Sequence, residues 1–383
     1  MSLSTATVAP PVAQSASDIR VAVVDDSAVV RGLVTRWIDE EPSLCTVGRY
    51  ANGQLALDGI RASQPDVIVL DIEMPVMDGM TALPLLLKQQ PGVKVIMAST
   101  LTRRNAEISL KALSLGAIDY IPKPENNRGV TTSSEFRVQL LRKIKAVAPK
   151  RGAATARAIT PDGVAARPGI RPALGQPAPA PALRPISSVP PKILVIGSST
   201  GGPQALQHMF DSIGPALTSI PVLVTQHMPA TFTTILAEHI GRASGLPSKE
   251  GEDNEPLQPG HIYVAPGGFH MAVKKTATGS AIRIYDGPDV NFCKPAVDPL
   301  FESVAPIYGP ATLAIVLTGM GSDGAVGGTR VADAGGTVIA QDEATSVVWG
   351  MPGATAAAGA CAAILPLDGV GKKVVELVRG SRS

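Results

Sequence analysis

Acidic side chains follow two apolar runs in the first third of the chain, and a lysine follows another. Asp25 and Asp26 come directly after VAVV, Asp71 comes directly after VIVL, and Lys123 lies just beyond AIDYI. Clustered carboxylates repel one another, so we expect a hard divalent cation or a cationic side chain beside them. Mg²⁺ held by two carboxylates and a carbonyl would leave positions for a phosphoryl group. Asp71 would then act as a nucleophile and become an acyl phosphate.

A serine in the second half of the chain lies on a glycine-rich turn. Residues 197–201, Gly-Ser-Ser-Thr-Gly, follow the apolar run ILVI and match the pattern G-x-S-x-G, and Pro203 suits the first turn of a helix. Such a turn lifts Ser199 above a sheet as a nucleophile, and the helix N-terminus offers N–H groups to an oxyanion. The alternative is a phosphate-binding loop, although neither the P-loop pattern nor the dinucleotide-binding pattern is present.

A serine nucleophile needs a base and an acid that orients the base. Of the five histidines, His227 follows the run PVLVT and would lie on the same sheet edge as Ser199, with His270 as the second candidate. Asp323, in a glycine loop beyond TLAIVL, is the expected acid. Asp342, after TVIAQ, competes with it, and the other interpretation of either aspartate is a helix N-cap.

Apolar runs alternate with amphipathic segments, which predicts parallel sheets covered by helices on both faces. We therefore predict an α/β fold of two doubly wound parallel-sheet domains, the second Rossmann-like with a β-hairpin insertion around 262–266 and 281–286. The expected helices include 28–39, 103–115, one from Pro203, 231–242 and 369–379. The expected strands are 21–24, 45–50, 67–70, 93–98, 117–121, 193–197, 221–225, 312–317 and 337–342.

Composition divides the 383 residues further. Residues 1–17 lack the basic and apolar regions of a signal peptide and predict a disordered tail. Residues 149–190 are rich in Pro, Ala and Arg, which is typical of a linker. These boundaries leave one domain over 18–148 and a second over 191–383.

Charge and cysteine content exclude several classes of protein. A net charge of +2 and 3% aromatic residues argue against nucleic-acid binding. Cys45, Cys293 and Cys361 form no disulfide or metal-binding pattern, so we expect a reducing compartment and buried, inert thiols. The uncharged runs 303–322 and 344–367 are interrupted by Pro and Gly, and we therefore expect a cytoplasmic protein that is not inserted in a membrane.

Residues 19–147 closely resemble the receiver domain of two-component response regulators. The resemblance implies a flavodoxin-like fold in which Asp71 is the phospho-acceptor and a histidine kinase is the donor. The resemblance also implies that Mg²⁺ is bound by Asp25, Asp26, Asp71 and the Glu73 carbonyl. Lys123 would contact the phosphoryl group. Ser99 (or Thr100) and Tyr120 would form the conformational switch.

Residues 192–379 resemble the catalytic domain of the chemotaxis receptor methylesterase family. The motifs GSSTGG, TQHMP, IYVAPGGFHM, LTGMGSDGA and IAQDEATSVVWGMP occur in this order. The resemblance implies Ser199 as nucleophile, His227 as general base, Asp323 as its orienting acid and the Met320 backbone N–H in the oxyanion site.

The expected function follows from both resemblances. A phosphorylation-regulated serine hydrolase would demethylate glutamyl methyl esters and deamidate glutamines on chemoreceptors, with Mg²⁺ in the receiver and none needed by the hydrolase. The unphosphorylated receiver would restrain the esterase.

A DNA-binding output domain would need a helix-turn-helix and a basic face, and residues 192–383 show neither. A small-molecule esterase is the other alternative.

Overall fold

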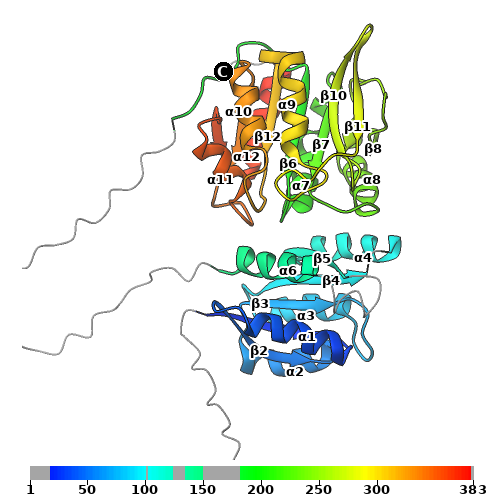
Figure 1. The fold of residues 1–383 in the computed structure, drawn as a ribbon, viewed down its shortest axis with the longest axis vertical. Coiled ribbons are helices and arrows are strands. Elements are labelled where there is room, and N and C mark those ends of the chain that lie inside the picture. The colour runs from blue at the N-terminus through cyan, green and yellow to red at the C-terminus, as the bar shows by residue number, and fades with distance from the viewer. Residues whose placement is uncertain (1–17, 101, 124–133, 150–181, 381–383) are drawn as a thin grey trace, which may run out of the picture. The chain divides into compact units, whose positions relative to one another are not determined.

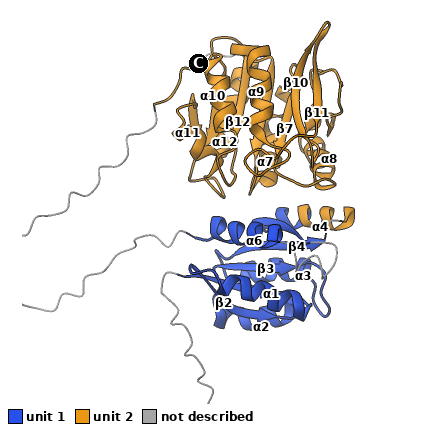
Figure 2. Cartoon of the chain, in the orientation of Figure 1, with its two compact units in different colours: residues 1–101, 111–149 blue, residues 102–110, 150–383 orange. Residues whose placement is uncertain are grey.

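The chain forms two compact units (Figures 1 and 2). The computed structural model describes residues 18–100, 102–123, 134–149 and 182–380. One unit spans residues 1–101 and 111–149, and the other spans residues 102–110 and 150–383. The expected tail and most of the expected linker lie outside the described residues.

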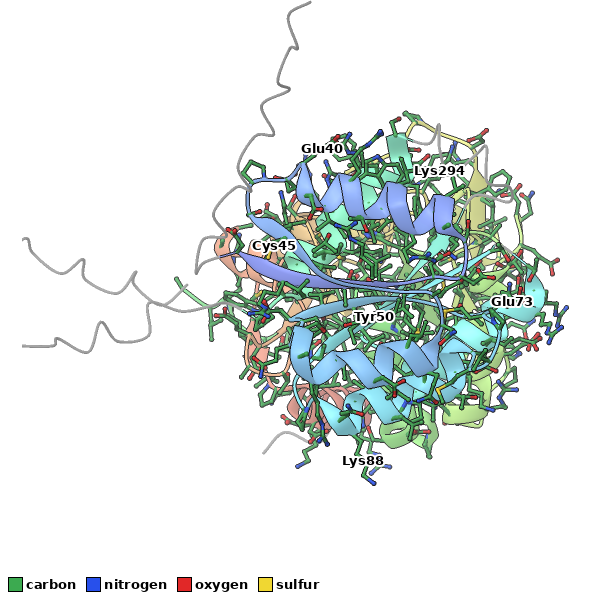
Figure 3. All side chains as sticks on the ribbon, turned by 90° about the horizontal axis from the view of Figure 1, so that it is seen from below. Glu40, Cys45, Tyr50, Glu73, Lys88 and Lys294 are labelled. Carbon is green, nitrogen blue, oxygen red and sulfur yellow. The ribbon has the colours of Figure 1, made fainter. Side chains whose placement is uncertain are left out.

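The first unit contains a five-stranded parallel sheet with the strand order β2-β1-β3-β4-β5. This order is that of a doubly wound, flavodoxin-like fold, in which functional groups gather beyond the carboxyl ends of the strands. The inner runs 21–24, 67–70 and 95–98 are apolar and buried because helices cover both faces of the sheet (Figure 3). Their bounds are β1 (Ile19–Val24), β2 (Leu44–Tyr50), β3 (Val67–Asp71), β4 (Lys94–Thr100) and β5 (Asp119–Lys123).

Helices alternate with these strands and follow the last one. Trp37 of α1 packs edge-on against Phe136 of α6, with ring centroids 6.0 Å apart. Ser27, Asn52 and Asp78 each accept a backbone N–H at the start of α1, α2 or α3, which fixes where these helices begin. The helix bounds are α1 (Ala28–Asp39), α2 (Gly53–Ser63), α3 (Gly79–Gln89), α4 (Arg103–Ser114) and α6 (Ser134–Val147).

The second unit is built on a seven-stranded parallel sheet with the order β14-β13-β12-β6-β7-β9-β8. The chain runs outward from β6 to β7 and later returns to β12 on the other side of β6, so the winding direction reverses there. Ligands of open α/β sheets bind at such a reversal. The bounds are β6 (Ile193–Ser198), β7 (Val222–Gln226), β8 (Ser248–Glu250), β9 (Ile262–Val264), β12 (Thr312–Val316), β13 (Thr337–Gln341) and β14 (Ala363–Leu365).

Helices cover this second sheet as well. Phe301 and Val304 of α9 are fully buried against strand residues such as Val195 and Val316. The helices are α7 (Gly202–Ile213), α8 (Phe232–Ser244), α9 (Val297–Tyr308), α10 (Ala325–Asp333), α11 (Met351–Ala357) and α12 (Leu367–Arg379). Within the described ranges, no helix has the length and apolar character needed to cross a bilayer.

An antiparallel hairpin is added to the second unit, as predicted, but with different strands. It consists of β10 (His270–Thr276) and β11 (Gly279–Tyr285). The segment 262–266, which we expected in the hairpin, instead contributes β9 to the main sheet between β7 and β8. Residues 262–264 are buried on both faces, as in a central parallel strand. The predicted α/β class with two doubly wound parallel sheets and a hairpin insertion is confirmed.

The last residues assigned to the linker from composition contact the second unit. The Arg184 guanidinium donates to the Gly359 carbonyl at 2.9 Å, and the Ser187 hydroxyl donates to the Pro310 carbonyl at 2.7 Å. Their carbonyl partners lie far away in the sequence, so the Pro- and Arg-rich composition, which is also compatible with an arginine-bearing docking segment, does not identify them.

Candidate functional site

Three carboxylates and one ammonium group meet at the carboxyl ends of β1, β3 and β5. Oxygens of Asp25, Asp26 and Asp71 lie within 4.8 Å of one another. Lys123 Nζ lies 2.7 Å from Asp25 Oδ2 and 2.7 Å from Asp71 Oδ1. One ammonium does not neutralise three carboxylates, and hard oxygen donors are the ligands that Mg²⁺ prefers. The residues present therefore fit a divalent cation.

The charge of this cluster depends on burial. Burial raises the pKa of Asp71 to about 6, the positive charge of Lys123 opposes this shift, and the negative charge of Asp25 adds to it. Burial alone would lower the pKa of Lys123, but the two carboxylates outweigh it and raise that pKa. Ionised Asp71 is thus costly without a further cation, because it is buried beside another carboxylate.

The turn after β3 is held close to Asp71. The Gly79 N–H donates to the Ile72 carbonyl at 2.8 Å, and a Cβ on Gly79 would lie 2.0 Å from the Asp71 carbonyl oxygen. Only glycine fits this approach. Glu73 is exposed in the same turn, two residues after Asp71 (Figure 3).

The expected switch residues lie on the neighbouring strands β4 and β5. Ser99 and Tyr120 are both buried, and Thr100 pairs with Lys123 in the sheet register. Burial, with the adjacent Asp119 carboxylate, raises the pKa of Tyr120 well above its usual range. Tyr120 is therefore a neutral, inward-facing phenol in this structure.

A main-chain carbonyl beyond β12 and a side chain of β7 hold the serine turn after β6. The Ser199 N–H donates to the Thr318 carbonyl at 3.0 Å, and the Ser199 carbonyl accepts from Gln226 Nε2 at 2.9 Å. Ser199 is half-buried, whereas the Ser198 hydroxyl is buried and donates to Gln226 Oε1 at 2.7 Å. Of these two serines, Ser199 is the one that a substrate can reach.

Glycines make this turn possible. Gly201 has a positive φ of 76°, and a Cβ on Gly202 would lie 2.0 Å from Gln226 Oε1. From the loop after β12, a Cβ on Gly319 would lie 2.9 Å from the Cβ of Ser199. The glycines around Ser199 thus reflect a lack of space as well as a strained backbone.

His227 and Asp323 lie together on this sheet edge. His227 follows β7, and its Nε2 lies 2.7 Å from Asp323 Oδ2. The two oxygens of Asp323 also accept the N–H groups of Val297 at 2.6 Å and Asp298 at 3.0 Å, at the start of α9. Asp323 is 1% exposed, so these donors replace water around its negative charge.

The pKa values of this pair shift in opposite directions. Burial alone would lower the pKa of His227, but hydrogen bonds to Asp323 and Cys293 outweigh it and raise the pKa to about 10. Burial alone would raise the pKa of Asp323, but His227 and the N–H groups at the start of α9 lower it. The resting pair is therefore an imidazolium and a carboxylate.

The other nitrogen of the His227 ring meets a cysteine. Cys293 Sγ lies 3.3 Å from His227 Nδ1, and among the described residues neither ring nitrogen forms a hydrogen bond with the Ser199 hydroxyl. Cys361 is buried, and burial raises its pKa to about 12, so the expectation of an inert thiol suits this residue. For Cys45 and Cys293 the expected burial is wrong, because both are only partly buried.

The competing candidates have structural contacts. His270 is 1% exposed, with Nε2 2.9 Å from the Pro288 carbonyl oxygen and Nδ1 accepting the Ala296 N–H at 3.3 Å. Asp342 accepts the Thr345 N–H at 2.9 Å and so closes its own turn. The structure places neither of them in contact with His227.

The oxyanion candidate lies in the loop after β12. The Gly319 N–H donates to the Val348 carbonyl at 3.0 Å, which fixes the chain just before Met320. Met320 is half-buried, and its own N–H has no hydrogen bond to the part of the chain that the structure describes. A substrate oxygen is a suitable partner for that N–H.

Sequence reasoning missed a second layer of residues behind Asp323. The Asn291 side chain donates to Asp298 Oδ2 at 3.0 Å and to Asp323 Oδ1 at 3.1 Å. Burial raises the pKa of Asp298 to about 6, with the Gly327 N–H opposing and the Asp323 charge adding to the shift. An aspartate beside a proline before an apolar helix resembles an N-cap, which conceals this role in the sequence.

Comparisons with known proteins match both units. A family described as CheB methylesterase matches residues 194–374, and the response regulator receiver domain family matches residues 21–133. The chain is 55% identical to the protein-glutamate methylesterase/protein-glutamine glutaminase of Nitrobacter hamburgensis, over 95% of each chain. It is 52% identical to that of the group 2 operon of Rhodopseudomonas palustris, over 100% of each chain. The crystal structure of the Thermotoga maritima CheB methylesterase catalytic domain is 42% identical, with a TM-score of 0.48, covering 50% of this chain and 100% of that one.

Proposed function

Because this chain belongs to the protein-glutamate methylesterase/protein-glutamine glutaminase family of response regulators, we propose that Ser199, His227 and Asp323 form its catalytic triad. The family acts on chemoreceptors, and its activity serves chemotactic adaptation.

The triad explains the hydrolysis of a glutamyl methyl ester. Asp323 holds Nε2 of His227, so Nδ1 is the nitrogen that takes the proton of the Ser199 hydroxyl. The Ser199 oxygen attacks the side-chain carbonyl, and the Met320 N–H donates to the oxyanion that forms. His227 returns the proton to the leaving methanol, or to ammonia when the substrate is glutamine. Water then attacks the acyl-enzyme, releases glutamate and restores the serine.

The observation that carries this proposal is the 2.7 Å contact between His227 and Asp323 on the edge to which the Ser199 turn is bonded. Ser199→Ala is expected to lower methanol release from methylated receptors by several orders of magnitude while circular dichroism stays unchanged. Ser212→Ala, at the end of α7, is the matched control. An active Ser199→Ala enzyme would refute the triad and direct attention to Ser198 or Thr200.

For the receiver we propose phosphorylation of Asp71 by a histidine kinase. Mg²⁺ would be held by Asp25, Asp26 and Asp71 with the Glu73 carbonyl, and would neutralise phosphoryl oxygens. The closely spaced carboxylates support this assignment. The switch would comprise Ser99, or Thr100, with Tyr120, and Lys123 would contact the phosphoryl group. The hydrolase steps above use only groups of the protein and water, so we assign Mg²⁺ to the receiver alone.

The phosphorylation proposal is tested with acetyl phosphate and Mg²⁺. One base-labile phosphoryl group is expected per chain, and Asp71→Asn is expected to remove it, whereas Asp58→Asn, exposed on α2, is expected to keep it. A label that persists in Asp71→Asn would place the acceptor elsewhere, with Asp26 examined first. The cytoplasmic location expected from the sequence stays a prediction.

A further inference from the structure

The thiol of Cys293 contacts the proposed catalytic base on the side of the ring away from Asp323. Its Sγ lies 3.3 Å from Nδ1 of His227, and Nε2 lies 2.7 Å from Asp323 Oδ2. A carboxylate only accepts hydrogen bonds, so Nε2 carries the proton that is donated to Asp323. Nδ1 is then the remaining nitrogen that can act as a base. Cys293 occupies the same nitrogen that Ser199 must use.

A tight turn places this thiol. Val290 and Cys293 exchange two backbone hydrogen bonds, of 2.9 and 3.1 Å. Asn291 and Phe292, between them, have positive φ values of 52° and 62°, an uncommon conformation for non-glycine residues. The Asn291 side chain donates to Asp323 Oδ1 at 3.1 Å. The turn that carries the thiol is therefore bonded to the same carboxylate that orients the His227 ring.

Few titratable groups surround the ring. In the described part of the chain, Cys293 and Asp323 contact it, and Asp298 at the start of α9 lies behind Asp323. Burial alone would lower the pKa of His227, whereas its contacts with Asp323 and Cys293 raise it to about 10. A protonated imidazole is not a base, so a group that stabilises the protonated ring also delays its use by Ser199.

We propose that Cys293 is a positioning residue that competes with Ser199 for Nδ1 of His227 and so sets the pH at which the base becomes available. This inference rests on the proposed triad. It involves no covalent change at sulfur: Nδ1 of the protonated ring, which faces Sγ, loses its proton to solvent, and the neutral ring then turns to the Ser199 hydroxyl. Substrate binding and the displacement of the thiol are then coupled.

The first test is the pH dependence of kcat/KM for methanol release from methylated receptors. In Cys293→Ala the acid limb is expected to move at least one pH unit lower, so that the rate at a fixed pH on that limb rises about tenfold. Cys45→Ser, a change of a partly buried thiol in β2, is the control and should match the wild type. Cys293→Ser, which keeps the size of the side chain, serves if the alanine variant does not fold. An acid limb that does not move, whether the rate falls or stays the same, would overturn the proposal.

The second test measures the thiol instead of the activity. With iodoacetamide at neutral pH, mass spectrometry is expected to show Cys293 labelled at least tenfold faster than buried Cys361, because the partly buried Cys293 thiol faces the positively charged His227 ring. His227→Ala should remove this advantage, and Ser199→Ala should preserve it. If Cys293 is labelled at the same rate in the wild type and in His227→Ala, the inference is overturned and the proposed triad is not. An active Ser199→Ala enzyme together with an inactive Cys293→Ala enzyme would make the thiol the nucleophile, and would overturn both the triad and the inference.

Discussion

His227 and Asp71 are buried ionisable groups whose neighbours determine their charge. His227 has a carboxylate on one nitrogen and a thiol on the other, and its pKa is raised to about 10. Asp71 shares Lys123 with Asp25, and burial raises its pKa to about 6. These surroundings favour the protonated form of both side chains. His227, however, acts as a base only when it is neutral, and Asp71 acts as a nucleophile only when it is ionised. A bound partner, substrate for His227 and a cation for Asp71, is needed to change that balance.

The first prediction concerns the acid that orients the base. Asp323→Asn keeps the shape of the side chain but removes the charge that holds the Nε2 proton of His227, so methanol release should fall by about 10²- to 10⁴-fold. Initial rates from methylated receptors measure the loss. Asp342→Asn, which disturbs only the turn that it closes with Thr345, should retain most of the activity. A larger loss in Asp342→Asn than in Asp323→Asn would exchange the two roles.

The second prediction links Asp71 to stability. Its pKa is raised from the ordinary 3.8 to about 6, so the folded receiver favours the protonated form. The resulting stabilisation is fully present below about pH 4 and is lost as the pH rises through about 6. Asp71→Asn should therefore stabilise the receiver at pH 7.5, by at most about 3 kcal/mol, and have little effect at pH 4. Calorimetry of the full chain at both pH values measures this, and equal shifts at both would contradict it.

At the level of the elements, short turns after parallel strands carry both sites. The ends of three strands of the second sheet lie around Ser199: β6 ends one residue before it, Gln226 closes β7, and the Thr318 carbonyl follows β12. The main chain of the nucleophile is thus fixed by residues about 30 and 120 positions away. Substitutions that disturb these hydrogen bonds should therefore displace Ser199 even though the substituted residues do not contact a substrate.

The third prediction tests that arrangement. A methyl group in Gly202→Ala would lie 2.0 Å from Gln226 Oε1, so the Gln226 side chain must move and lose its hydrogen bonds to Ser198 and Ser199. We expect a loss of about 1–3 kcal/mol in stability and a fall in kcat. Gly369→Ala in α12, where the nearest atom is 3.4 Å away, is the control. A Gly202→Ala enzyme that equals this control in both thermal melting and kcat would contradict the prediction.

At the level of the whole molecule, a phosphorylation site and a hydrolase site lie in separate units of one chain. Arg184 and Ser187 form hydrogen bonds with Gly359 and Pro310 of the second unit. The chain is therefore already held against that unit before β6 begins at Ile193. A chain segment between two units keeps them at a high effective concentration. This arrangement agrees with the expectation from the sequence that the unphosphorylated receiver restrains the hydrolase.

The fourth prediction follows from that expectation. A fragment of residues 182–383 should release methanol about 5- to 150-fold faster than the unphosphorylated full chain, and acetyl phosphate should not affect it. A fragment of 191–383 lacks Arg184 and Ser187, and should melt at a lower temperature than the longer fragment. Initial rates at equal concentration and thermal melting measure both effects. A folded 182–383 fragment that is slower than the full chain would mean that the receiver assists the hydrolase.

The sequence by itself determined the fold class and the residues from which the sites are drawn. Alternating apolar and amphipathic segments predict parallel sheets, and polar residues that follow such strands necessarily share one edge of a sheet. Asp71 and Ser199 were found in this way, and the order of the motifs indicated the family. These features are local, because strand and helix periodicity depends on neighbouring residues.

Which side chains of the sites contact one another is determined by the tertiary structure alone. The pairing of His227 with Asp323 joins residues 96 positions apart, and the contact with Cys293 depends on a turn that folds back over 66 positions. The parallel pairing of β9 and the docking of Arg184 likewise depend on partners that no local pattern reveals. Side-chain contacts at these separations depend on how loops close and which groups are buried. This is why the base was predictable from the sequence and the thiol that contacts it was not.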